Sequence, residues 1–74
     1  MSSPLAFQQF PHVTAHSLAA GRVFRAERAA CLLTLGDAAA ALGLTVVQLS
    51  DVERGRAAVG PIDEAFMRLR KAKR

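Results

Sequence analysis

The stretch LTLGDAAAALGLTVVQLSDVERGR, residues 33–56, contains two short apolar segments separated by Gly43. Thr34 precedes Asp37 by three residues, and Thr45 begins a Thr-x-x-Gln pattern that is typical of a capping box at a helix N-terminus. A glycine at position 43 favours the left-handed conformation that ends many helices. The stretch therefore predicts two helices joined by a turn of about three residues, the arrangement of a helix-turn-helix unit.

Helical spacing continues on both sides of this stretch. It predicts a helix that begins near residue 15, and a further helix after the loop at residues 56–60, with Pro61 in its first turn. The glycine at position 55 is expected to end the helix that begins at Thr45. The apolar residues expected to face the core are Leu18, Phe24, Cys31, Leu49, Val52, Phe66, Met67 and Leu69. We predict four helices and no strands, which is an all-α fold.

The first thirteen residues contain two prolines and no usable periodicity. Phe7 and Phe10 either pack against the domain or belong to a loose arm. We expect an N-terminal arm at residues 1–13 and a single domain at residues 14–74 that ends in a basic helix. A core of this size supplies only about 3–5 kcal/mol, so we expect idealised helical packing, a dimer or a stabilising partner.

The chain carries a net charge of +4, with ten basic residues against six acidic ones. This balance favours a polyanionic partner, although many basic proteins bind nothing acidic. Cys31 is the single cysteine and forms no internal disulfide, which is typical of a reducing compartment. No apolar segment is long enough to span a membrane and the N-terminus lacks the pattern of a secretion signal. We expect a cytoplasmic protein that is not anchored to a membrane.

The residues that could support catalysis are few. His12 and His16 are four residues apart and would share a helix face, as metal ligands do, but Pro11 adjoins His12 and no third ligand is evident. The sequence shows no pairing of a nucleophile with a base and no glycine-rich loop for phosphate. We therefore expect no enzymatic activity, no metal and no cofactor.

The stretch resembles the repressor/Cro-type helix-turn-helix domains of phage and bacterial regulators, known as the XRE family. The match extends over residues 17–57. The matching residues are Leu33, Thr34, Ala39, Leu42, Gly43, Leu44, Thr45, Leu49, Ser50, Val52, Glu53 and Gly55. The resemblance implies a small lambda-repressor-like fold, for which this chain offers four helices where the family commonly has five. It also implies a sequence-specific regulator of transcription, expected to be a repressor that binds an inverted-repeat operator in double-stranded DNA as a homodimer at the nucleoid.

The resemblance assigns one pair of charges. An arginine late in the first helix of such domains pairs with the glutamate that ends the third helix, and these residues are Arg28 and Glu53 here. A guanidinium can hold a carboxylate through two parallel hydrogen bonds, which would clamp the two helices together. The chain departs from the family pattern at Leu35, where glutamine often contacts a phosphate, and at Ala38, where leucine is usual.

In this family the helix that begins at Thr45 enters the major groove and reads bases. The residues at the reading positions are Val46, Val47, Gln48, Ser50 and Asp51. Glutamine can pair with adenine, serine bonds to several bases, valine contacts thymine methyl groups and aspartate accepts from cytosine. Each has a simpler interpretation: the glutamine closes its capping box, the aspartate faces solvent and the valines form a protein-binding patch.

Phosphate contacts are expected from the residues that flank this helix. These are Thr34, Thr45, Arg54 and Arg56. Arg22 and Arg25 would add to them if their face lies near the duplex. The basic tail, residues 68–74, either adds affinity that does not depend on sequence or is a frayed terminus. The alternative function is a helix-turn-helix module that binds protein, such as an antitoxin, an anti-repressor or an accessory subunit.

Overall fold

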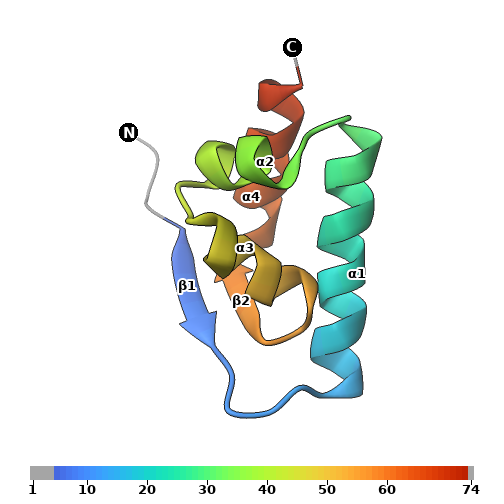
Figure 1. Ribbon diagram of the computed structural model, residues 1–74, viewed down its shortest axis with the longest axis vertical. Helices are drawn as coiled ribbons and strands as arrows, with labels where there is room; N and C mark the ends of the chain where they lie inside the picture. Colours follow the sequence, from blue (N-terminus) through green and yellow to red (C-terminus); the bar gives the residue numbers. More distant parts are fainter. Residues whose placement is uncertain (1–4, 74) are drawn as a thin grey trace.

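The computed structural model describes residues 5–73, which form four helices and two strands. In chain order these are β1 (Ala6–Gln9), α1 (Ala15–Ala30), α2 (Leu35–Leu42), α3 (Val46–Glu53), β2 (Ala57–Gly60) and α4 (Ile62–Ala72). In Figure 1 the long helix α1 stands along one side of the molecule, the strands lie on the other side, and α4 runs behind α2. The fold is mostly helical, as predicted. Residues 1–4 of the expected arm and Arg74 of the basic tail lie outside the described residues.

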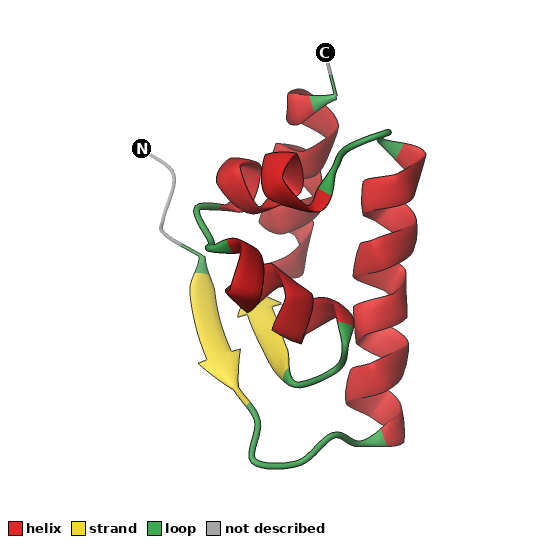
Figure 2. Cartoon of the chain, in the orientation of Figure 1, coloured by secondary structure: helices red, strands yellow, loops and turns green. Residues whose placement is uncertain are grey.

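The prediction that the chain forms no strands is wrong, because two four-residue strands pair into a small antiparallel sheet (Figure 2). Ala6 lies opposite Gly60, and Gln9 lies opposite Ala57. One strand comes from the segment expected to be an arm, and the other comes from the segment expected to be a loop. The described part of that arm is therefore tied to the domain.

Burial explains why the two segments pair. Phe7 of β1 packs against the hydrophobic core, and Ala57 and Val59 of β2 are buried within it. Pairing satisfies the backbone groups that this burial removes from water. The pairing continues one residue beyond β1, since the N–H of Phe10 donates to the carbonyl of Arg56 at 2.7 Å.

The helix α1 begins at Ala15, as predicted, and a capping box that was not predicted holds its N-terminus. The Thr14 hydroxyl accepts from the Ser17 N–H at 3.0 Å, and the Ser17 hydroxyl accepts from the Thr14 N–H at 2.9 Å. Ser17 is buried, so its hydroxyl needs partners within the protein. The reciprocal hydrogen bonds supply them.

The two central helices begin at the threonines that the sequence indicated. The Thr45 hydroxyl accepts from the Gln48 N–H at 3.1 Å, and the Gln48 Oε1 accepts from the Thr45 N–H at 3.0 Å, so the predicted capping box is confirmed. The Thr34 hydroxyl accepts from the Asp37 N–H at 3.1 Å, without a reciprocal bond. Gly43 follows α2 with a φ of 71°, in the predicted left-handed conformation.

Replacing Gly43 with alanine tests this turn. No atom lies within 4 Å of the position that a Cβ would take, so the cost comes from the backbone conformation alone, about 1 kcal/mol. Gly43→Asn should lose less, because asparagine tolerates this conformation. Urea unfolding followed by circular dichroism measures both variants, and equal losses would show that the conformation of this turn is not what the glycine supplies.

The C-terminal helix α4 packs its apolar side against α1 and α2. The rings of Phe66 and Phe24 lie 5.0 Å apart between centroids, and Leu69 is buried. Pro61 is the N-cap residue rather than part of the first helical turn. The prediction that Met67 faces the core is wrong, since it is 53% exposed. The buried apolar core consists of Phe24, Cys31, Ala38, Ala39, Leu42, Leu49, Val52, Ala57, Val59, Ala65 and Leu69.

Candidate nucleic-acid interface

The helix α3 presents one side to solvent. It is bent by 101° from α2, across the turn at residues 43–45. Leu49 and Val52 are each only 1% exposed, which fixes the inner side of α3 against the core. Val46 and Val47 lie on its first turn and are 48% and 70% exposed. The arrangement leaves an outward face on α3 that begins with two apolar side chains.

The other residues predicted to read bases are half-buried, and two of them already form hydrogen bonds within the protein. Gln48 uses one lone pair of its carboxamide oxygen in the capping box, which leaves a second lone pair and two N–H donors. Ser50 is half-buried. Asp51 is also half-buried, and its Oδ2 accepts a hydrogen bond from Gln9 Nε2 at 3.3 Å.

The four residues predicted to contact phosphate lie at the ends of α2 and α3. The hydroxyl oxygens of Thr34 and Thr45 accept the capping bonds already described, so each hydroxyl retains its proton as a donor. Arg54 is the C-cap residue of α3, and Arg56 follows two residues later. Both are exposed, and within residues 5–73 neither side chain forms an ion pair.

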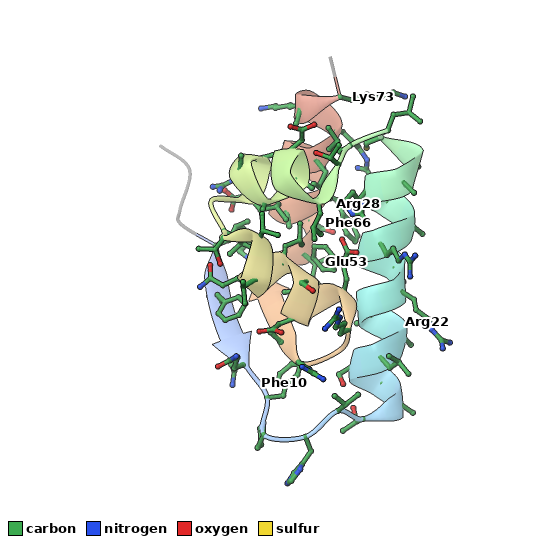
Figure 3. All side chains as sticks on the ribbon, in the orientation of Figure 1. Phe10, Arg22, Arg28, Glu53, Phe66 and Lys73 are labelled. Carbon is green, nitrogen blue, oxygen red and sulfur yellow. The ribbon has the colours of Figure 1, made fainter. Side chains whose placement is uncertain are left out.

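The remaining positive charges divide into paired and unpaired groups. Three of the described arginines form ion pairs with glutamates: Arg28 with Glu53, Arg68 with Glu64, and Arg70 with Glu27. No ion pair within the described residues includes Arg22, Arg25, Lys71 or Lys73. Figure 3 shows that the Arg22 side chain points away from the body of the molecule, on the outer side of α1, and that Lys73 lies at the end of α4. Of the unpaired arginines, Arg54 and Arg56 therefore lie closest to α3 along the chain.

The ion pair between Arg28 and Glu53 connects α1 to the end of α3, and Figure 3 shows the two side chains facing one another. Arg28 Nε donates to Glu53 Oε2 at 2.7 Å, and Nη2 donates to Oε1 at 3.0 Å, which is the two-bond geometry expected above. A third bond runs from Arg28 Nη1 to the Leu33 carbonyl at 3.2 Å. The hydrogen bond to Glu53 raises the pKa of Arg28, burial opposes the increase, and the glutamate charge adds to it.

The two histidines do not share a helix face, because α1 begins after Thr14 and His12 precedes it. Across residues 5–73, no three histidine, cysteine, aspartate or glutamate side chains are grouped as metal ligands would be. A mostly apolar cavity of about 150 Å³ lies between α1, α3 and β2, with His16 among its lining residues. Ser17 also lines the cavity, and its hydroxyl forms hydrogen bonds with Thr14.

Sequence reasoning did not identify Gln9 as part of this region. Gln9 is 42 residues from Asp51 in the chain, and the two meet only because β1 pairs with β2. No local pattern indicates a contact of that range. Alternation along β1 places Gln9 on the same face as Phe7 once the strand is known, but four residues are too few to show that alternation in the sequence.

In a comparison with known proteins, no family model, curated protein or solved structure matches this chain. Within residues 5–73, no single helix is long and apolar enough to cross a membrane; α2 and α3 reach that length only together, across their 101° bend.

Proposed function

We propose that this protein binds double-stranded DNA by inserting α3 into the major groove. The observation that carries the proposal is the placement of α3: it follows α2 after a three-residue turn and a 101° bend, and its outward face is followed by two unpaired arginines. Recognition helices of helix-turn-helix proteins have this relation to the preceding helix. The net charge of +4 also suits a polyanionic partner.

Four residues of α3 have specific roles in this proposal. Val46 and Val47 contact thymine methyl groups, since they expose apolar surface and offer no hydrogen bonds. Gln48 reads adenine through its free N–H donors and second lone pair while it keeps its cap. Ser50 adds a contact at the edge of the face.

The phosphate contacts hold the protein on the duplex. Arg54 and Arg56 supply positive charge beside α3, and the Thr34 and Thr45 hydroxyls donate to phosphate oxygens at the N-termini of α2 and α3. Such contacts set affinity and register, whereas base contacts set sequence preference. The protein is proposed to act as a repressor of the Cro type in the cytoplasm, at the nucleoid, without a catalytic step or a cofactor.

Binding as a homodimer is part of the proposal. One module of this size buries a modest interface, so a two-fold pair on an inverted repeat would raise affinity. Selection from a random duplex library at near-physiological salt tests this directly. We expect enrichment of an inverted repeat whose half-sites lie about one helical turn, roughly 34 Å, apart. Binding that enriches no sequence and disappears as salt rises would overturn the proposal.

Two substitutions separate base reading from phosphate binding. Gln48→Ala should change the preferred base at one position of the selected sequence. Arg54→Ala should weaken binding to all duplexes nearly equally and lower the salt slope of the affinity by about one. Fluorescence anisotropy over a salt series, on selected and random duplexes, measures both effects. If the two variants lose equally on both duplexes, the assignment of roles is wrong.

A second candidate function follows from the exposure of Val46 and Val47. Two apolar side chains on an outward helix face also suit a protein partner, as in an antitoxin, an anti-repressor or an accessory subunit. Pull-down of one stoichiometric partner, lost in a Val46→Ser/Val47→Ser double variant, would favour this function if the selection enriches no sequence.

A further inference from the structure

The carboxylate of Asp51 lies on the face of α3 that is proposed to enter the major groove. Asp51 follows Val47 by four residues and precedes Arg54 by three, so all three project from neighbouring positions on one side of the helix. Facing the phosphates of a duplex, this negative charge opposes binding to every sequence. It becomes favourable only where a base donates a hydrogen bond to it.

The strand β1 holds this carboxylate from the side. Gln9 Nε2 donates to Asp51 Oδ2 at 3.3 Å, between two side chains that both reach solvent. Within the described residues, this is the side-chain hydrogen bond that joins β1 to α3. Strand alternation places the neighbouring Gln8 on the opposite face of β1. Gln9 therefore lies at the edge of the α3 surface, while an identical side chain one residue away does not.

We infer that Gln9 and Asp51 act together as a filter for a base that presents an exocyclic amine in the major groove. This inference rests on the proposed function. Cytosine N4 and adenine N6 are such amines and donate to a carboxylate, whereas guanine O6 and thymine O4 are acceptors that a carboxylate repels. The bond from Gln9 holds one oxygen of Asp51 in place and leaves the other oxygen for the base.

The two amine bases differ in what Gln9 adds. Adenine presents the N7 acceptor beside its amine, and the second N–H of the Gln9 amide is a donor that suits N7. Cytosine offers no acceptor there, so Gln9 would act on cytosine only by positioning Asp51. The size of the change in base preference that Gln9→Ala causes thus distinguishes adenine from cytosine.

Selection from the random duplex library, repeated with variants, tests the filter. In the selection with the unaltered chain, one position of the half-site should be restricted to adenine or cytosine on one strand, with about tenfold discrimination against guanine and thymine. Asp51→Ala should remove this restriction, because alanine has no acceptor for the amine, and should bind random duplexes more tightly, since a negative charge is lost. An unchanged restriction in Asp51→Ala would overturn the filter and leave the proposed function standing.

Gln9→Ala and Gln8→Ala form a matched pair for the role of the strand. Gln9→Ala should relax the same position that Asp51→Ala relaxes, strongly if the selected base is adenine and less if it is cytosine. Gln8→Ala should match the unaltered chain at every position. In an Asp51→Ala background, Gln9→Ala should add nothing at that position.

The outcomes distinguish a failure of DNA binding from a failure of the filter. If the unaltered chain enriches no sequence, the proposed function fails and the filter fails with it. If a sequence is enriched but Gln9→Ala reproduces it at every position, the role of Gln9 is overturned while DNA binding stands. Urea unfolding of each variant shows whether it remains folded, and a purely structural bond would shift that midpoint without changing the base preference.

Discussion

Replacing Gly21 with alanine is expected to remove most of the protein's free energy of unfolding. A Cβ on Gly21 would lie 2.5 Å from the Val52 carbonyl oxygen and 2.6 Å from that of Glu53, which are backbone atoms at the end of α3. Backbone atoms cannot rotate away as a flexible side chain can, so α1 and α3 must move apart. Overpacking of a core costs about 1–3 kcal/mol and more in rigid sites, while a domain of this size has only about 3–5 kcal/mol to lose.

Gly36→Ala is the matched control for this substitution. Gly36 also lies within a helix, but the nearest atom to its Cβ position is Thr34 Oγ1 at 4.0 Å. Because alanine favours the helix over glycine, this variant should gain about 0.5–1 kcal/mol. Urea unfolding followed by circular dichroism measures both. Similar midpoints for the two variants would mean that the close approach of α1 to α3 is not required for the fold.

Local signals allowed much of the helical structure to be predicted from the sequence. The capping box at Thr45 and the glycine at position 43 each depend on residues within one helical turn, and both are present. Such signals act through the backbone groups at a helix end, which need a partner wherever the helix lies. They do not depend on the rest of the fold.

The sheet could not be predicted in this way. Ala6 pairs with Gly60 across nearly the whole chain, and no short turn connects the strands to indicate a hairpin. Each strand has only four residues, too few for a clear alternation. The pairing is fixed by burial of Phe7 and Val59 against helices whose positions must be known first. Contact between distant segments decided this part of the fold.

In the candidate site, too, local patterns in the sequence predicted the features that depend on them, and did not predict the features that depend on distant contacts. The exposed face of α3 followed from helical spacing. The partner of Arg28 was expected only because the chain resembles a family in which that arginine pairs, and charge alone gave no reason to prefer it over Arg22 or Arg25. The contact of Gln9 with Asp51 depends on the sheet, so it was missed along with the sheet.

Removing Arg28 is the second substitution for which a large effect is expected. Glu53 is 9% exposed, and Arg28→Ala would leave its carboxylate buried without the two N–H groups that now satisfy it. A charge left in this way costs about 3 kcal/mol. The Leu33 carbonyl also loses its bond from Arg28. Glu53→Ala should cost less, because Arg28 is 21% exposed and its long side chain can turn its charge to water.

The ion pair at Arg70 provides the control for these substitutions. Arg70 Nη2 lies 2.6 Å from Glu27 Oε1, a distance as short as that between Arg28 and Glu53, but Arg70 is 62% exposed. Arg70→Ala should therefore cost about 0.5 kcal/mol or less, since solvent screens the pair. A loss as large as that of Arg28→Ala would show that proximity of charges, rather than burial, determines the cost.

A double variant, Arg28→Met/Glu53→Leu, separates the cost of breaking the pair from its net contribution. Both charges are then replaced by apolar side chains, so neither is left unpaired, and the loss should be much smaller than for Arg28→Ala alone. The raised pKa of Arg28 means that its stabilisation is fully present below the pKa of the unfolded side chain, and is lost only as pH rises through the higher folded value. The coupling energy from a double-mutant cycle in which Arg28→Met and Glu53→Leu are the single variants should therefore be equal at neutral and mildly alkaline pH. If the double variant loses as much as Arg28→Ala, the clamp between α1 and α3 contributes a net attraction that apolar packing cannot replace.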